Sequence, residues 1–157
     1  MQEALLCPSS QPGFEECRVL GVVQPGENGG APEVAYLNQH LPVTREVLDL
    51  AAPAQPTEVF RLAAQCQSDK CPHFDGADCR LATRIVQILP AVVSTLPACG
   101  IRHDCRWFRQ EGAAACHRCP QIVTVNYNVS ETMREVVGVE SFSCGSHAAG
   151  TGLTIGE

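Results

Sequence analysis

The sequence predicts an α+β fold, with an N-terminal β-hairpin plus helix, then a small helical cysteine-rich segment and a mobile Gly-rich tail. Three observations predict it. A β-branched run, a set of turn residues and a second apolar run follow one another between residues 18 and 37. An amphipathic helical repeat occupies residues 78–89, and seven cysteines fall between Cys66 and Cys119.

The first part of the chain, residues 1–56, has the pattern of a hairpin followed by a helix. Strands are expected at residues 18–23 and 33–37, where β-branched or alternating apolar residues flank a turn rich in Gly and Pro. Thr44 supplies an N-cap for a helix that Pro53 ends.

The middle part, residues 57–124, is expected to be helical and to bind metal. Thr57, Asp78 and Asp104 each supply an N-cap for a helix. The first of these helices is expected to carry its apolar side chains from residue 59 towards Cys66. In the second, apolar side chains recur at i, i+4, i+7 and i+8, which is the spacing of one helix face.

The last part, residues 125–157, is predicted to hold a C-terminal strand and a flexible tail. The strand is expected to occupy residues 122–127, across the start of this part, and a short helix is expected near residues 131–137. The final stretch, residues 145–157, is small and Gly-rich, so we expect it to be mobile.

Charge and the N-terminus limit the possible partners and the compartment. The formal net charge is −6, with a net +2 between Cys66 and Cys119 and −8 elsewhere, which disfavours nucleic acid and anionic membranes and leaves a protein as the expected partner. The chain shows neither a signal peptide nor an apolar run long enough to span a membrane. The expected location is therefore cytoplasmic, where clustered cysteines indicate metal or catalysis more often than disulfides.

Cysteine is the main functional signal, because a chain of 157 residues does not need ten cysteines for stability. The spacing is Cys-x4-Cys-x7-Cys, followed by Cys-x5-Cys-x10-Cys-x2-Cys. The seven metal-ligand candidates are Cys66, Cys71, Cys79, Cys99, Cys105, Cys116 and Cys119. The other three, Cys7, Cys17 and Cys144, are expected to be ordinary thiols.

The spacing favours an iron–sulfur cluster, of the 4Fe–4S type, over zinc. Structural zinc usually uses two tight pairs, and only Cys116 and Cys119 form one here. These two residues with Pro120 resemble the end of the cluster-binding run of bacterial ferredoxins, although the rest of that run is absent. Zinc, disulfides and redox thiols remain alternatives.

Seven cysteines make one four-cysteine site and one three-cysteine site. The second could be completed by a cysteine from outside the segment or by a histidine, with His73 and His117 the nearest in sequence. In a straight helix, Cys105 and Cys116 would stand about 16 Å apart along the axis. We therefore expect the chain to bend at Gly112.

With that bend, two groups are predicted. The first joins Cys99, Cys105, Cys116 and Cys119. The second joins Cys66, Cys71 and Cys79, either as part of the first site or as a second one. Trp107 and Phe108 are expected to pack in the core.

Three functions are compatible with such a segment. The preferred one is an iron–sulfur protein that transfers electrons to a partner enzyme or senses its redox state. A zinc-stabilised adaptor that binds a protein or nucleic acid is the second. An enzyme with an open-site cluster is the third, and since no acid–base pair stands out, the sequence leaves enzymatic activity undecided.

Overall fold

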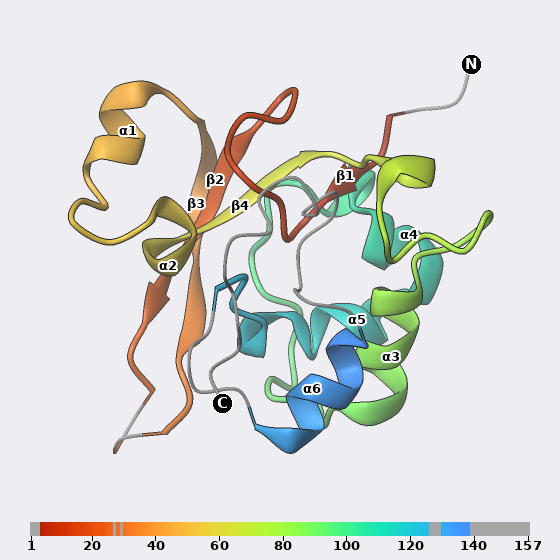
Figure 1. Ribbon diagram of the computed structural model, residues 1–157. Coiled ribbons are helices and arrows are strands. Elements are labelled where there is room, and N and C mark those ends of the chain that lie inside the picture. Colours follow the sequence, from red (N-terminus) through yellow and green to blue (C-terminus); the bar gives the residue numbers. More distant parts are fainter. Residues whose placement is uncertain (1–3, 27, 29, 126–129, 139–157) are drawn as a thin grey trace.

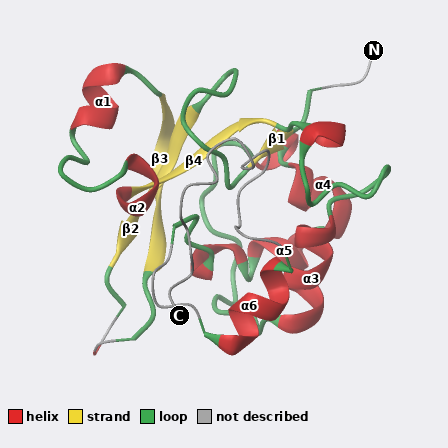
Figure 2. Cartoon of the chain, in the orientation of Figure 1, coloured by secondary structure: helices red, strands yellow, loops and turns green. Residues whose placement is uncertain are grey.

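A computed structural model describes residues 4–26, 28, 30–125 and 130–138 of the chain. Its centre is a four-stranded antiparallel sheet in the order β1-β4-β2-β3, with helices on both sides (Figure 1 and Figure 2). The predicted mixed α+β class is confirmed. The strands are β1 (Leu6–Cys7), β2 (Arg18–Gln24), β3 (Glu33–Pro42) and β4 (Phe60–Gln65).

The helices divide into two sets that cover opposite faces of the sheet. Two short helices pack on one face through Val19, Phe60 and Leu62, and the remaining helices enclose the larger core on the other face with Leu20 and Ala63. They are α1 (Arg45–Asp49), α2 (Pro56–Val59), α3 (Arg80–Ile88), α4 (Arg106–Glu111), α5 (Ala113–Cys116) and α6 (Glu131–Val137). Short 3-10 turns occupy Ser68–Lys70, Arg102–Asp104 and Cys119–Gln121.

The predicted hairpin is present as β2 and β3, with a register shift between Val19 and Gly21. At this shift the sheet needs glycine, since a Cβ on Gly21 would lie 2.6 Å from the carbonyl oxygen of Ala35. The irregularity leaves Leu20 on the face of the larger core.

The helix predicted from Thr57 is wrong, because α2 ends at Val59 and the chain continues as β4. β4 lies between β1 and β2, and its residues 60–64 are buried. A strand covered on both faces shows no alternation of apolar and polar residues, so its pattern cannot be distinguished from that of a buried helix. The N-cap of α2 is Gln55.

The other caps lie close to their predicted positions. Thr44 caps α1 as predicted, with its side chain accepting a hydrogen bond from the Val47 N–H. α3 and α4 each begin one residue later than expected, so that Cys79 and Cys105 are the N-caps in place of Asp78 and Asp104. In both cases the acidic residue lies in the turn that precedes the helix.

The C-terminal part has the expected helix but not the expected strand in its described residues. Residues 122–125 form no strand, and instead Ile122, Val123 and Val125 are buried in irregular backbone. The predicted helix near residues 131–137 is confirmed as α6. The remainder of the predicted strand, residues 126–127, and the Gly-rich stretch 145–157 lie outside the described residues. In the part of the chain that is described, no helix is long and apolar enough to cross a membrane.

Candidate metal centre

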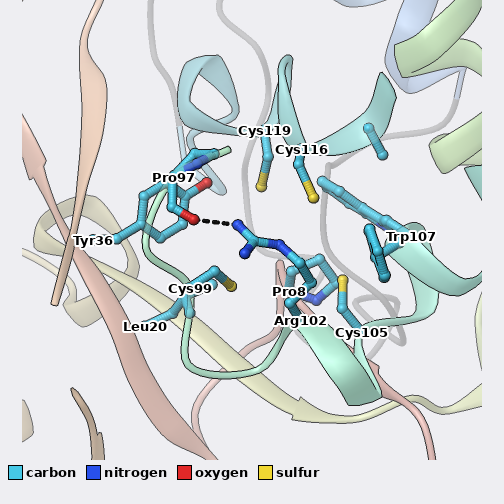
Figure 3. A pocket seen from close by; sticks show the side chains of 12 residues that line it. Pro8, Leu20, Tyr36, Pro97, Cys99, Arg102, Cys105, Trp107, Cys116 and Cys119 are labelled. Carbon is cyan, nitrogen blue, oxygen red and sulfur yellow. Dashed lines mark hydrogen bonds between the residues drawn. The ribbon is translucent and has the colours of Figure 1, made fainter. Parts of the chain in front are cut away.

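Four cysteines from the expected first group line one pocket between the sheet and the helices (Figure 3). We call Cys99, Cys105, Cys116 and Cys119 the first cysteine group. Cys99 lies in the coil after α3, Cys105 caps α4, Cys116 ends α5 and Cys119 begins the following 3-10 turn. The other residues that line the pocket are Pro8, Leu20, Tyr36, Pro97, Arg102, Trp107, Phe108 and Ala115.

The turn at Gly112 brings the first group together. Gly112 has φ 71 and ψ −155, and it ends α4 and begins α5. This positive φ is a conformation that glycine adopts without steric cost. The two short helices therefore change direction between Cys105 and Cys116, which a continuous helix would hold about 16 Å apart.

A second contact fixes the coil that carries Cys99. The carbonyl oxygen of His117, between Cys116 and Cys119, accepts hydrogen bonds from the N–H groups of Val92 and Val93 at 2.8 and 3.3 Å. The coil after α3 is thus tied to the turn that carries the tight cysteine pair.

The environment of the first group opposes thiolate formation by unassisted thiols. Burial raises the pKa of Cys105, although the N–H groups of Phe108 and Trp107 partly offset this by hydrogen bonding. Burial also raises the pKa values of Cys99 and Cys116, while the nearby Arg102 acts to lower both. Since metal ligands must be thiolates, such a site ionises only together with a cation.

Arg61 supplies a permanent positive charge behind Cys119. It is fully buried, and its guanidinium donates to the Cys119 Sγ at 3.1 Å and to the carbonyl oxygens of Cys119 and Ile122 at 3.1 and 2.7 Å. Its Nε donates to the carbonyl oxygen of Pro8. Across the described ranges, no carboxylate forms a salt bridge with Arg61.

The ionisable neighbours of Arg61 are two thiols and a phenol. Burial by itself would lower the pKa of Arg61, but its electrostatic interactions with Cys119, Tyr36 and Cys7 and its hydrogen bond to Cys119 raise it overall. A buried cation needs a buried anion, because an uncompensated charge in a protein interior costs several kcal/mol. The groups beside Arg61 that could carry this charge are the thiols of Cys119 and Cys7.

Tyr36 adds a neutral donor to the same sulfur. Burial and the negative charge of Cys119 raise the pKa of Tyr36 well above its ordinary value. The hydroxyl thus stays protonated and donates a hydrogen bond to the Cys119 sulfur.

Two further N–H donors at the pocket remain unmatched. The Trp107 Nε1 and the Arg102 Nε are buried and have no hydrogen-bond partner among the described residues. Trp107 is only 1% exposed, and the Arg102 side chain lies between the four thiols and bonds to the Pro97 carbonyl (Figure 3). Both N–H groups could donate to an acceptor in this pocket, and a group bound by the four thiols would require the Arg102 side chain to turn out of the space between them.

The other three candidate ligands lie outside this pocket, although Cys79 packs in the same core cluster as Cys105 and Cys119. Cys66, Cys71 and Cys79 do not line the first pocket, and Cys66 and Cys71 pack with Cys7. His73 is buried beside Cys71, and His117 is half-buried between Cys116 and Cys119. Cys17 packs on the opposite face of the sheet, near α1, and Cys144 lies outside the described residues.

Sequence reasoning missed Cys7, Arg61 and Tyr36. All three come from residues before Cys66, and only the sheet brings them to the cysteine-rich segment. An available signal for Arg61 was its place within the apolar run of residues 59–64, where a charged residue requires a partner.

No disulfide joins any two of the nine cysteines within the described ranges. In those same ranges, no three side chains of the His, Cys, Asp and Glu types stand close enough to hold a single metal ion directly.

Comparison with protein-family models, with curated proteins and with solved structures finds no match to this chain. Its function is therefore inferred from its own residues.

Proposed function

We propose that the protein binds a 4Fe–4S cluster through Cys99, Cys105, Cys116 and Cys119 and acts in electron transfer or redox sensing for a partner enzyme. The observation that carries this proposal is the pairing of four thiols around one pocket with the fully buried Arg61, which bonds to the Cys119 sulfur and forms no salt bridge with a carboxylate in the described chain. The donor set consists only of thiols, as in most such clusters.

The cluster would accept and release single electrons, which is the chemistry that it supplies when bound. The residues of the chain would hold it and adjust its potential. Trp107 and Leu20, both 1% exposed, keep water from the thiols. Arg61 and Tyr36 donate hydrogen bonds to the Cys119 sulfur, and positive charge and N–H···S bonds both raise the potential of a thiolate-ligated centre.

Four thiols around one pocket favour electron transfer over open-site catalysis. A 4Fe–4S cluster presents four irons, and four cysteines can ligate all of them. An enzyme that binds substrate at iron would leave one position open.

Anaerobic purification followed by iron, sulfide and zinc analysis tests this proposal. Iron and acid-labile sulfide in equal amounts, with broad visible absorption, are expected. Cys116→Ser should remove this cluster, and Cys17→Ser is the matched control because Cys17 packs on the far face of the sheet. A colourless protein that contains zinc, or iron content that is equal in both variants, would contradict the proposal.

A further inference from the structure

Four more cysteines lie outside the first pocket, in β1, just after β4, in the loop that follows and at the start of α3. Cys7 is fully buried in β1, and Cys71 is 6% exposed. Cys66 packs against this pair together with Phe74. Cys79 caps α3 and is 4% exposed. We call Cys7, Cys66, Cys71 and Cys79 the second cysteine group.

Backbone pairing holds Cys7 next to Cys66. β1 pairs with the end of β4, so that Cys7 lies opposite Ala64 and Leu6 lies opposite Gln65. The Cys66 N–H then donates to the carbonyl oxygen of Leu5 at 2.8 Å. Two cysteines that are 59 positions apart in the sequence therefore share one sheet edge.

A closed loop holds Cys71 next to Cys79. The Asp75 carboxylate accepts hydrogen bonds from the N–H groups of Ala77 and Asp78 at 3.0 and 2.8 Å. A bridge between Phe74 and Cys79 closes this turn. The seven residues between Cys71 and Cys79 thereby fold back on themselves, which places Cys79 near Cys71.

The two pairs face each other. Burial raises the pKa of Cys79 to about 12, and the negative charges of Cys7 and Cys71 contribute to this rise. In the fold, Cys7 and Cys71 form one buried cluster on which Cys66 and Phe74 pack, and Phe74 forms a backbone bridge with Cys79. The Cys71 sulfur also accepts a hydrogen bond from the His73 N–H at 3.4 Å.

Positive charge surrounds this group as well. Arg106 lies over the ring of Phe74 at 5.6 Å, and its buried Nε has no hydrogen-bond partner among the described residues. Arg61 interacts electrostatically with Cys7 as well as with Cys119. Cys66 opens to a surface hollow that Phe74, Arg106 and Arg109 also line.

We propose that Cys7, Cys66, Cys71 and Cys79 form a second four-cysteine site for an iron–sulfur cluster, so that the chain holds two clusters. The proposal extends the proposed function but is separable from it, because the two groups share no cysteine. Cys7 completes the group that the cysteine-rich segment leaves one ligand short.

The two sites are neighbours on either side of β1. Leu6 forms a bridge with Cys105, Cys7 belongs to the second group, and Pro8 lines the first pocket. One electron can therefore pass between the two clusters, with one oxidised as the other is reduced and with no bond made or broken. The hollow beside Cys66 gives a partner access to this pair from the second site.

Anaerobic reconstitution of the full chain with iron and sulfide tests the second site. The wild type should bind about eight iron ions, as two 4Fe–4S clusters. Native mass spectrometry should show the mass of both clusters, and the fully reduced protein should show an electron paramagnetic resonance spectrum broadened by coupling between two spins.

Variants separate this proposal from the first. Cys7→Ser and Cys71→Ser should each halve the iron and leave a narrow, uncoupled signal, as should Cys116→Ser, while Cys17→Ser should match the wild type. Wild-type iron and coupling in folded Cys7→Ser protein would overturn the second site. So would loss of all iron from that variant, since it would indicate one shared cluster. If Cys7→Ser fails to fold, the native mass of the wild type decides, and the mass of a single cluster refutes the proposal.

Discussion

Replacing Arg61 with methionine removes a buried guanidinium while keeping a side chain of similar length. The wild-type side chain makes hydrogen bonds to three carbonyl oxygens and to the Cys119 Sγ, and it lies 5.5 Å from the ring centre of Trp107. Methionine can keep the packing on Trp107 but none of the hydrogen bonds. The substitution therefore tests the charge and the donors together.

In the Arg61→Met protein, both the free energy of unfolding and the reduction potential of the cluster should fall. Removing one partner of a buried charge pair costs about 3–5 kcal/mol, and each unsatisfied carbonyl contributes about 1–3 kcal/mol of that loss. A unit charge about 5 Å from the electron acceptor changes the free energy of reduction by about 3 kcal/mol at an effective dielectric constant of about 20. For a one-electron couple this equals about 130 mV. The potential should become more negative, because the added electron loses a nearby cation.

Arg61→Lys separates the two effects. Lysine keeps the charge but lacks the planar fork that reaches several acceptors at once. The Arg61→Lys protein should lose much of the unfolding free energy that Arg61 contributes, but its reduction potential should change little. Arg45→Met is the control, because Arg45 is exposed on α1, away from both cysteine groups.

Denaturant unfolding and protein-film voltammetry under anaerobic conditions measure these effects. If the cluster-loaded Arg61→Met protein keeps the wild-type potential, Arg61 does not lie beside the redox centre and the assignment of the first group fails. If its stability also equals that of Arg45→Met, sulfur does not balance the charge of Arg61 as argued.

Arg102→Ala should retain the iron and lower the potential less than Arg61→Met does, because solvent screens the half-buried Arg102; an equal or larger decrease in voltammetry contradicts this. Burial raises the pKa of Cys17 from 9.0 to about 11, although Arg18 partly offsets it. Its neutral thiol thus contributes stability that is complete below pH 9.0 and is lost as the pH rises through about 11. Unfolding free energies should show an added slope of up to about 1.4 kcal/mol per pH unit, which Cys17→Ser should lack. Metal removal under reducing conditions should lower amide-exchange protection in residues 66–119 and leave the β2–β3 pairing protected. Full protection of the loop 71–79 after metal removal would mean that the loop folds without ligation.

Sequence patterns predicted the elements whose signals are local. The β2–β3 hairpin, the Thr44 cap and α6 follow from turn residues, a hydroxyl N-cap and helical periodicity. The expected change of direction at Gly112 also follows from a local property, since a glycine interrupts the helical pattern there.

The errors arise where tertiary context decides. β4 has the pattern of a buried helix because both of its faces are covered, one by each hydrophobic core. β1 has only two residues, Leu6 and Cys7. A strand this short shows no alternating pattern, so its pairing with β4 could not be predicted from the sequence. Cys7 was consequently treated as an ordinary thiol, although the sheet brings it to Cys66 and Cys71.

Arg61 links the cysteine groups to the rest of the fold. It lies in the central region of the sheet on β4, and its partners come from the segment after β1 and from the turn that carries Cys119. If the thiols were all neutral, this guanidinium would be a buried cation without a counter-charge, which is costly. Bound metal would keep the thiols ionised, so ligation of the proposed cluster and burial of Arg61 would stabilise each other. Loss of the cluster would therefore weaken the sheet as well as the cysteine loops, and that coupling is what a sensor needs to convert a redox change into a change of shape.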